Sequence, residues 1–204
     1  MLNAEEEFKR RNTEIDEYLT HLETLESASG LSVTLMNTMK SSALLMIYNI
    51  VESTMTNLLQ DLFDHLQNES VSFDDLNDKM KELVLGFAKK HNPGKLIGKM
   101  RTQTLDLAVA CFERSEVFSG NLDAKEIRET MKRIGVKMTH AYTESALQNV
   151  KNERNNLAHG NKSFSDCGKD YTAVQLRDIQ KKTQTVLAKA IADFDGFLTQ
   201  QAYA

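Results

Sequence analysis

Several residue types that mark particular protein classes are scarce in this chain of 204 residues. It contains one Pro, two Cys and no Trp. Cys111 and Cys167 stand far apart and form no CxxC pair, so we expect both to be reduced, without a disulfide framework or a zinc site. No two of the five histidines have helical i, i+4 spacing, and no P-loop or GxSxG motif occurs. The sequence therefore predicts no metal and no other cofactor.

Long apolar runs and targeting signals are also missing. The longest apolar stretch, residues 43–51, contains Asn49 and is too short to cross a membrane. The first residues, Met-Leu-Asn-Ala-Glu-Glu-Glu, lack the basic and apolar regions of a secretory signal. We therefore expect a soluble, cytoplasmic protein with no membrane partner.

The charge is modest and unevenly distributed. A net charge of -4 argues against a protein that coats nucleic acid through charge alone, because such binding needs clustered Lys and Arg. Residues 1–29 are acidic, whereas residues 89–101 contain five basic residues and no acidic one: Lys89, Lys90, Lys95, Lys99 and Arg101. This basic strip is a weak candidate for guiding RNA, and a solvated loop is the simpler interpretation.

Apolar residues recur at threes and fours along most of the chain, which is typical of amphipathic helices. The spacing and the capping residues predict helices over residues 5–27, 32–68, 72–90, 102–118, 123–134, 143–160 and 172–197. The second helix would be about 55 Å long at about 1.5 Å per residue. No segment alternates apolar and polar residues over the length of a strand, so the predicted class is an all-α bundle with a long central helix.

This length suits one domain over residues 1–204. We divide it into an N-terminal helix, a long helix with a helical insertion, and a motif-bearing helix followed by the C-terminal helix. The corresponding ranges are 1–30, 31–118 and 119–204.

Residues 151–161, Lys-Asn-Glu-Arg-Asn-Asn-Leu-Ala-His-Gly-Asn, combine a guanidinium, amides and an imidazole near the end of a helix. An imidazole titrates near neutral pH, so His159 could move protons during cleavage of a phosphodiester. Arg154 could stabilise the negative charge that develops on the phosphate. Asn155 and Asn156 could hold the phosphate or orient the imidazole. The alternative is a surface Arg and a His that interacts favourably with the helix dipole.

The spacing within this motif points to a dimer. Arg154 and His159 lie about 140° apart around a regular helix, so two such residues from one chain converge poorly. Two copies facing each other across a twofold axis would bring both residue types to a shared cleft. Arg133 and His140 have similar spacing, but Gly135 interrupts that helix, and we interpret the match as coincidence.

Three segments resemble small bacterial proteins of the HEPN superfamily. They are residues 48–53 (Tyr-Asn-Ile-Val-Glu-Ser), 119–123 (Ser-Gly-Asn-Leu-Asp) and 154–164 (Arg-Asn-Asn-Leu-Ala-His-Gly-Asn-Lys-Ser-Phe). HEPN nucleases carry Arg, then a polar residue, with His after four to six residues, a pattern that residues 154–159 match. The resemblance is closest to the RiboL-PSP-associated HEPN branch. It implies a helical bundle, a homodimer with a composite cleft, and an RNA endonuclease that uses no metal.

The resemblance also implies a role in toxin-antitoxin or antiphage systems, with an antitoxin or defence-system protein as partner. Glu52 would face the cleft, or else form a buried ion pair that stabilises the bundle. Some HEPN toxins have a Tyr two residues beyond the His, whereas this chain has Asn161, so regulation through that tyrosine is not expected. The alternatives are a catalytically silent HEPN bundle that binds a nucleotide or a protein, and a purely structural helical dimer.

Overall fold

The computed structural model describes residues 2–28, 30, 32–88, 121–139 and 144–204. These residues form helices and no strand, which confirms the predicted all-α class. The helices are α1 (Asn3–Ser27), α2 (Val33–Asn68), α3 (Asp78–Ala88), α7 (Ala124–Ile134), α8 (Glu144–Ala158), α9 (Phe164–Gly168) and α10 (Ala173–Thr199). The predicted helix over 102–118 and the basic strip from Lys89 to Arg101 lie outside the described residues.

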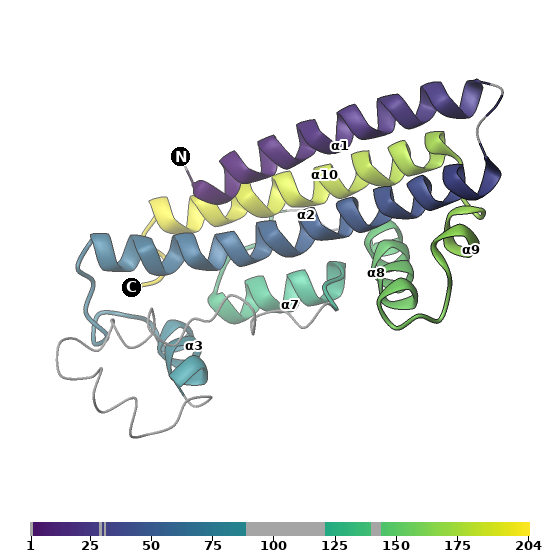
Figure 1. Cartoon of the computed structure of the whole chain (residues 1–204). Helices are drawn as coiled ribbons and strands as arrows, with labels where there is room; N and C mark the ends of the chain where they lie inside the picture. The colour runs from purple at the N-terminus through teal and green to yellow at the C-terminus, as the bar shows by residue number, and fades with distance from the viewer. Residues whose placement is uncertain (1, 29, 31, 89–120, 140–143) are drawn as a thin grey trace.

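The three longest helices, α1, α2 and α10, pack side by side, with α1 antiparallel to the other two (Figure 1). Each contributes apolar side chains at helical spacing, such as Ile15, Leu19 and Leu22 of α1, which are at most 2% exposed. The second half of α2 is buried on several sides, as expected for a helix with neighbours around it. The long helix is therefore central to the bundle, as the sequence predicts.

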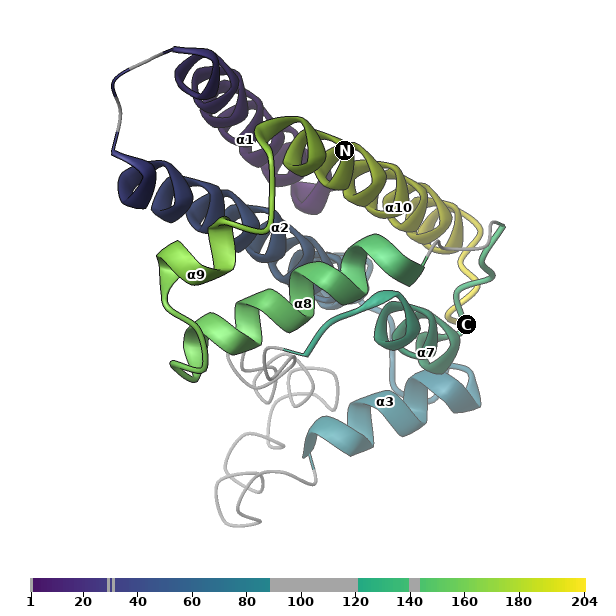
Figure 2. The ribbon, with the colours of Figure 1, turned by 90° about the vertical axis from the view of Figure 1, so that its right-hand side faces the viewer.

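The shorter helices cover one side of this layer. Figure 2 shows α8 and α9 next to α2, with α7 beside α8 and α3 beyond α7, and contacts between these helices agree with that arrangement. The chain ends against the far end of α2, where the hydroxyl of Tyr203 lies 3.2 Å from Nε2 of His65. The motif-bearing helix α8 is thus held against both α2 and α10.

Local capping signals set several of the helix ends. The Asp123 side chain accepts a hydrogen bond from the Glu126 N–H, and Gly135 ends α7 with a φ of 99°, as expected for a left-handed C-cap. Thr172 and Gln175 form a capping box at the start of α10. The third helix begins later than predicted, because the Asn77 side chain caps Met80, whereas the residues from Ser72 onward form a turn.

The helix α9 is absent from the sequence prediction, which has no helix between residues 160 and 172. Ser163 caps it by accepting from the Asp166 N–H at 3.1 Å. Tertiary contacts hold it against α2: the Ser41 hydroxyl donates to the Phe164 carbonyl at 2.6 Å. A Cβ placed on Gly168 would lie 1.8 Å from the carbonyl oxygen of Asn37, so only glycine permits this approach of the two backbones.

Within the described residues, no helix has both the length and the apolar character needed to span a bilayer.

Candidate functional site

The guanidinium of Arg154 lies against the second helix of the bundle. Its central carbon is 5.1 Å from the centre of the Tyr48 ring, which α2 contributes. Its Nη1 donates a hydrogen bond to Oδ1 of the adjacent Asn155 at 3.1 Å. A cation over an aromatic face is attracted by the ring quadrupole. Arg154 is therefore half-buried and held between a ring and an amide.

Tyr48 is almost completely buried beneath that guanidinium, with 1% of its surface exposed. Its hydroxyl accepts a hydrogen bond from the Leu122 N–H at 3.1 Å. Burial raises the pKa of Tyr48, and the Glu52 charge raises it further, whereas the Leu122 N–H and the Arg154 charge lower it. Glu52 lies one turn after Tyr48 and is half-buried. The charges of Glu52 and Arg154 therefore act in opposite directions on the pKa of the Tyr48 hydroxyl.

Residues 121–123, which precede α7, contact α8 close to Arg154 and Tyr48. Nδ2 of Asn155 donates to Oδ1 of Asn121 at 3.0 Å. Nζ of Lys151 lies 2.5 Å from Oδ2 of Asp123. Although burial raises the pKa of the Asp123 carboxyl, the hydrogen bond from Lys151 holds it below its usual range.

All three segments that carry the sequence resemblance therefore meet around Tyr48. We call this group the α2–α8 cluster: Tyr48, Glu52, Asn121, Asp123, Lys151, Arg154 and Asn155. A permanently charged guanidinium with amides beside it can stabilise an anion such as a phosphate group.

His159 lies at the end of α8, outside the side-chain contacts of the cluster. Its N–H donates to the Asn155 carbonyl at 3.0 Å, and its imidazole is exposed. Gly160 follows with a φ of 68°, and the Asn161 N–H donates to the Asn156 carbonyl at 2.8 Å, which is the pattern of a Schellman cap. Arg154 thus lies against α2, whereas His159 projects from the helix end, as the angle between them predicts.

Asn156 contacts a different group from the one containing Arg154. Its Nδ2 donates to Oε2 of Glu153 at 3.3 Å, and Lys162 also binds that carboxylate. Of the predicted site residues, Arg154, Asn155 and Glu52 share one region, whereas Asn156 belongs to the turn after α8. The basic strip cannot be placed, because it lies outside the described residues.

Sequence reasoning missed the part that Tyr48 and Asn121 play. Both lie in segments that resemble the HEPN superfamily, so that resemblance was the available signal. Neither residue shows by its local spacing that it would meet α8, because Tyr48 and the Leu122 N–H are 74 positions apart. Long-range convergence of this kind becomes visible only in the structure.

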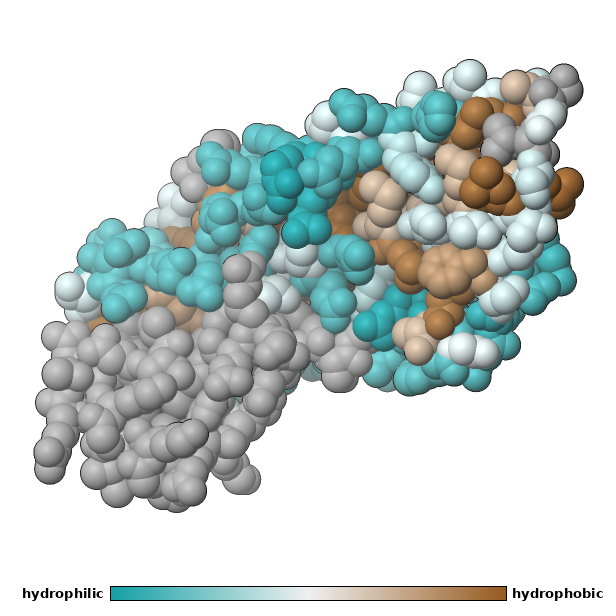
Figure 3. Space-filling view, in the orientation of Figure 1, coloured by the Kyte–Doolittle hydropathy of each residue, from teal (hydrophilic) through white to brown (hydrophobic). Residues whose placement is uncertain are grey.

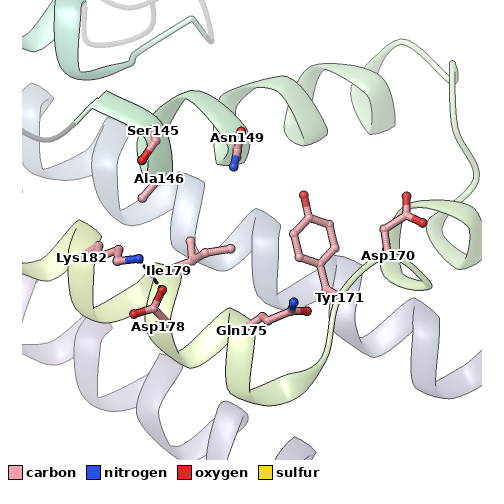
Figure 4. Close-up of a pocket in the computed structure, with 9 residues that line it drawn as sticks. All are labelled: Ser145, Ala146, Asn149, Asp170, Tyr171, Gln175, Asp178, Ile179 and Lys182. Carbon is pink, nitrogen blue, oxygen red and sulfur yellow. Dashed lines mark hydrogen bonds and ion pairs between the residues drawn. The ribbon is translucent and has the colours of Figure 1, made fainter.

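A pocket of about 260 Å³ opens on another side of α8, between α8 and α10 (Figure 4). Ser145 and Asn149 line it from α8, and Tyr171, which precedes α10, points its ring toward α8. Its charged lining residues are Asp170 and the ion pair between Asp178 and Lys182, whose atoms are 2.5 Å apart. With two acids and one base, this pocket does not favour a phosphate group.

An apolar patch lies at the beginning of α2 and on α9. Val33, Leu35 and Phe164 are 74%, 51% and 38% exposed, and Figure 3 shows brown residues gathered over this end of the molecule. Figure 2 shows the end of α8 on the same side as α9 and the start of α2. Among the described residues, no group of three His, Cys, Asp or Glu side chains could hold a metal ion.

Comparison with known proteins gives one family. A model of the family described as HEPN_MAE_28990-like HEPN matches residues 3–203, almost the whole chain. The match confirms the predicted superfamily, although the description differs from the RiboL-PSP-associated branch that the sequence resembles. No curated protein and no solved structure matches the chain.

Proposed function

This chain belongs to the HEPN_MAE_28990-like HEPN family, and from that premise we propose that it is an RNA endonuclease that uses no metal. The observation that carries the proposal is the position of Arg154. Its guanidinium is held over the Tyr48 ring with Asn155 beside it, in a cluster built from three separate segments. Such an arrangement suits recognition of a phosphate group by a planar cation.

In the proposed reaction, the RNA 2'-hydroxyl attacks the neighbouring phosphorus and the bond to the 5'-oxygen breaks. His159 acts as general base or general acid, taking the proton of the 2'-hydroxyl or giving one to the 5'-oxygen. Arg154 stabilises the charge on the phosphate oxygens, and Asn155 assists as a neutral donor. The products are a 2',3'-cyclic phosphate and a free 5'-hydroxyl, so atoms and charge balance without a metal.

We further propose that the active form is a homodimer. Arg154 and His159 point in different directions from one helix, so a second copy would complete the site. The exposed apolar patch at the start of α2 and on α9 supports this proposal, because it lies on the side where α8 ends. A role as a toxin or antiphage effector, controlled by an antitoxin or a defence-system protein, is part of the same proposal.

The test is cleavage of labelled RNA in the presence of a chelator. Arg154→Ala and His159→Ala are each expected to lower kcat by about 100-fold or more, since each removes one stabilising or proton-transferring group. Arg133→Ala is the matched control, because Arg133 belongs to the coincidental Arg–His pair and lies outside the cluster. Equal cleavage by all four proteins would contradict the nuclease proposal.

Mixing the two inactive variants tests the composite site. A heterodimer of Arg154→Ala and His159→Ala protomers holds one site in which Arg154 comes from one copy and His159 from the other. We expect partial recovery of cleavage in the mixture, together with a dimer in analytical ultracentrifugation. A monomeric wild type that cleaves RNA would contradict the dimer and leave the chemistry intact.

The second candidate is a catalytically silent nucleotide-binding module. Polar residues that line the pocket between α8 and α10, such as Ser145 and Asn149, would hold the base and ribose, and the phosphate groups would lie outside the pocket, away from its two carboxylates. Binding of a nucleotide by a wild type that does not cleave RNA, with loss of binding in Asn149→Leu, would support this candidate over the nuclease.

A further inference from the structure

The carboxylate of Glu153, on α8, binds Lys162 in the turn that follows this helix. Oε1 and Oε2 of Glu153 lie 3.0 and 3.1 Å from Nζ of Lys162. The Glu153 side chain is 13% exposed and that of Lys162 is 33% exposed, so this pair is more shielded than most ion pairs between the described residues. Asp170, at the edge of the pocket in Figure 4, lies 3.8 Å from the same Nζ. Lys162 therefore closes the turn that begins at His159.

The backbone of the turn is fixed to the same part of α8. The N–H groups of Asn161 and Lys162 both donate to the Asn156 carbonyl, at 2.8 and 3.3 Å. The Asn156 side chain in turn donates to Glu153 at 3.3 Å. Gly160 has the positive φ that this type of helix end requires, and these hydrogen bonds fix the path of the chain from His159 to Lys162. The imidazole thus projects from a short segment that is held at both ends.

The Glu153 carboxylate also contacts α9, which is itself fixed to α2. The Cys167 thiol donates to Oε2 of Glu153 at 3.3 Å. Burial raises the pKa of that thiol to about 11, so it stays protonated at neutral pH and remains a donor. The close approach of Gly168 to Asn37 holds α9 against α2. Glu153 therefore links the His159 turn to the rigid part of the bundle.

Both members of the pair are charged over a wide pH range. Although burial raises the pKa of Glu153, hydrogen bonds from Lys162, Asn156 and Cys167 hold it below its usual value. The hydrogen bond to Glu153 raises the pKa of Lys162. The pair therefore stabilises the turn above the unfolded pKa of Glu and below that of Lys. Its contribution is lost as the pH falls through the folded pKa of Glu153.

We propose that Glu153 and Lys162 are positioning residues that hold the His159 turn in place, an inference that rests on the proposed nuclease function. They act on the imidazole through the backbone of residues 159–162 and do not contact the RNA. Proton transfer requires close placement of the base, and a displacement of about 1 Å can cost about 100-fold in rate. Loss of the ion pair should therefore affect the chemical step more than substrate binding.

The experiment compares Lys162→Met, Lys162→Arg and Glu153→Gln with Lys169→Met. Lys169 directly follows α9 and forms an exposed pair with Asp166 of that helix at 3.3 Å, so it serves as the matched control. Lys162→Met is expected to lower kcat by about 10-fold to 100-fold with little change in KM, whereas Lys162→Arg recovers most of the activity. Lys169→Met should behave as the wild type. Thermal unfolding shows which variants are folded, and Glu153→Gln serves if Lys162→Met is not.

A second measurement does not depend on cleavage. The imidazole Cε1–H signal of His159, assigned by its loss in His159→Ala, should be single and narrow in the wild type. It should broaden or shift in Lys162→Met and not in Lys169→Met. An unchanged signal and an unchanged kcat in folded Lys162→Met would overturn the positioning role while the nuclease function stands. If the wild type does not cleave RNA, the nuclease proposal fails, and the signal alone decides whether the pair orders the turn.

Discussion

Two regions of this molecule are each organised around one arginine, and their surroundings differ. The first region is the contact between α1 and α10, which we call the seam and define by Arg177, Asp16, Thr20 and Glu23. Arg177 donates to Asp16 at 2.7 Å and to Glu23 at 3.0 Å. It also donates to the Thr20 hydroxyl at 2.9 Å. Two carboxylates from α1 therefore bind one guanidinium from α10. This arrangement joins two helices by long charged side chains.

In the α2–α8 cluster, Arg154 of α8 contacts an aromatic ring, which is not among the described contacts of Arg177. Arg154 lies over the Tyr48 ring and donates to an amide, and the neighbouring contact between α9 and α2 depends on the backbone at Gly168. Ring faces, amides and close backbone contacts leave less conformational freedom than long ion-paired side chains. We infer that the contacts between α1 and α10 mainly hold these two helices together, whereas the contacts among α2, α8 and α9 hold side chains at fixed positions.

Among the variants considered, Gly168→Ala should lower the free energy of unfolding the most. The added Cβ would lie 1.8 Å from the Asn37 carbonyl oxygen, so α9 must move away from α2. We expect a loss of about 3 kcal/mol in the free energy of unfolding, measured in urea, because overpacking against backbone cannot be relieved by a side-chain rotation.

Gly196→Ala in α10 is the matched control for that change. Its Cβ would meet only Gln200 Nε2, at an ordinary contact distance of 3.9 Å. Replacing this helical glycine should stabilise the protein by about 0.5 kcal/mol. Equal stability of Gly168→Ala and Gly196→Ala would contradict the expectation that the backbone contact between Gly168 and Asn37 restricts α9 to its position.

A smaller effect is expected from Arg177→Met in the seam. The variant leaves Asp16 and Glu23 without their cation, but these carboxylates are 52% and 34% exposed, so water compensates in part. We expect a loss of about 1 to 2 kcal/mol in urea unfolding, with RNA cleavage at the wild-type rate. Reduced cleavage by a fully folded Arg177→Met protein would show that the seam also shapes the site.

The sequence was sufficient for features that depend on neighbouring residues. Periodic apolar side chains predicted the long helices, and Asp123, Gly135 and Thr172 act at helix ends as their types indicate. The start of α3 and the whole of α9 were predicted wrongly. A five-residue helix has too few hydrogen bonds to form alone, and α9 depends on contacts with α2 that no local pattern encodes.

In the candidate site, too, the sequence predicted the features that depend on neighbouring residues but not the contacts between distant segments. The spacing of Arg154 and His159 is local, so the motif could be found in the sequence, and their different directions followed from helix geometry. Tyr48 and Asn121 reach α8 from distant segments, and nothing in their spacing specifies that meeting. The contact of Glu153 with Cys167 likewise needs α9 to be placed first.

The smallest effect is expected for Tyr48→Phe. Comparing this variant with Tyr48→Leu distinguishes the role of the Tyr48 ring from that of its hydroxyl. Tyr48→Phe keeps the face beneath Arg154 but removes the acceptor for the Leu122 N–H, which should cost about 1 kcal/mol in urea unfolding. Cleavage should remain close to that of the wild type, because the guanidinium keeps its platform. Tyr48→Leu also removes the ring, and with it a cation–π attraction of about 0.5 to 2 kcal/mol, so kcat should fall as well. If both variants cleave RNA equally well, the ring does not position Arg154, and the ring contact would not distinguish Arg154 from Arg177.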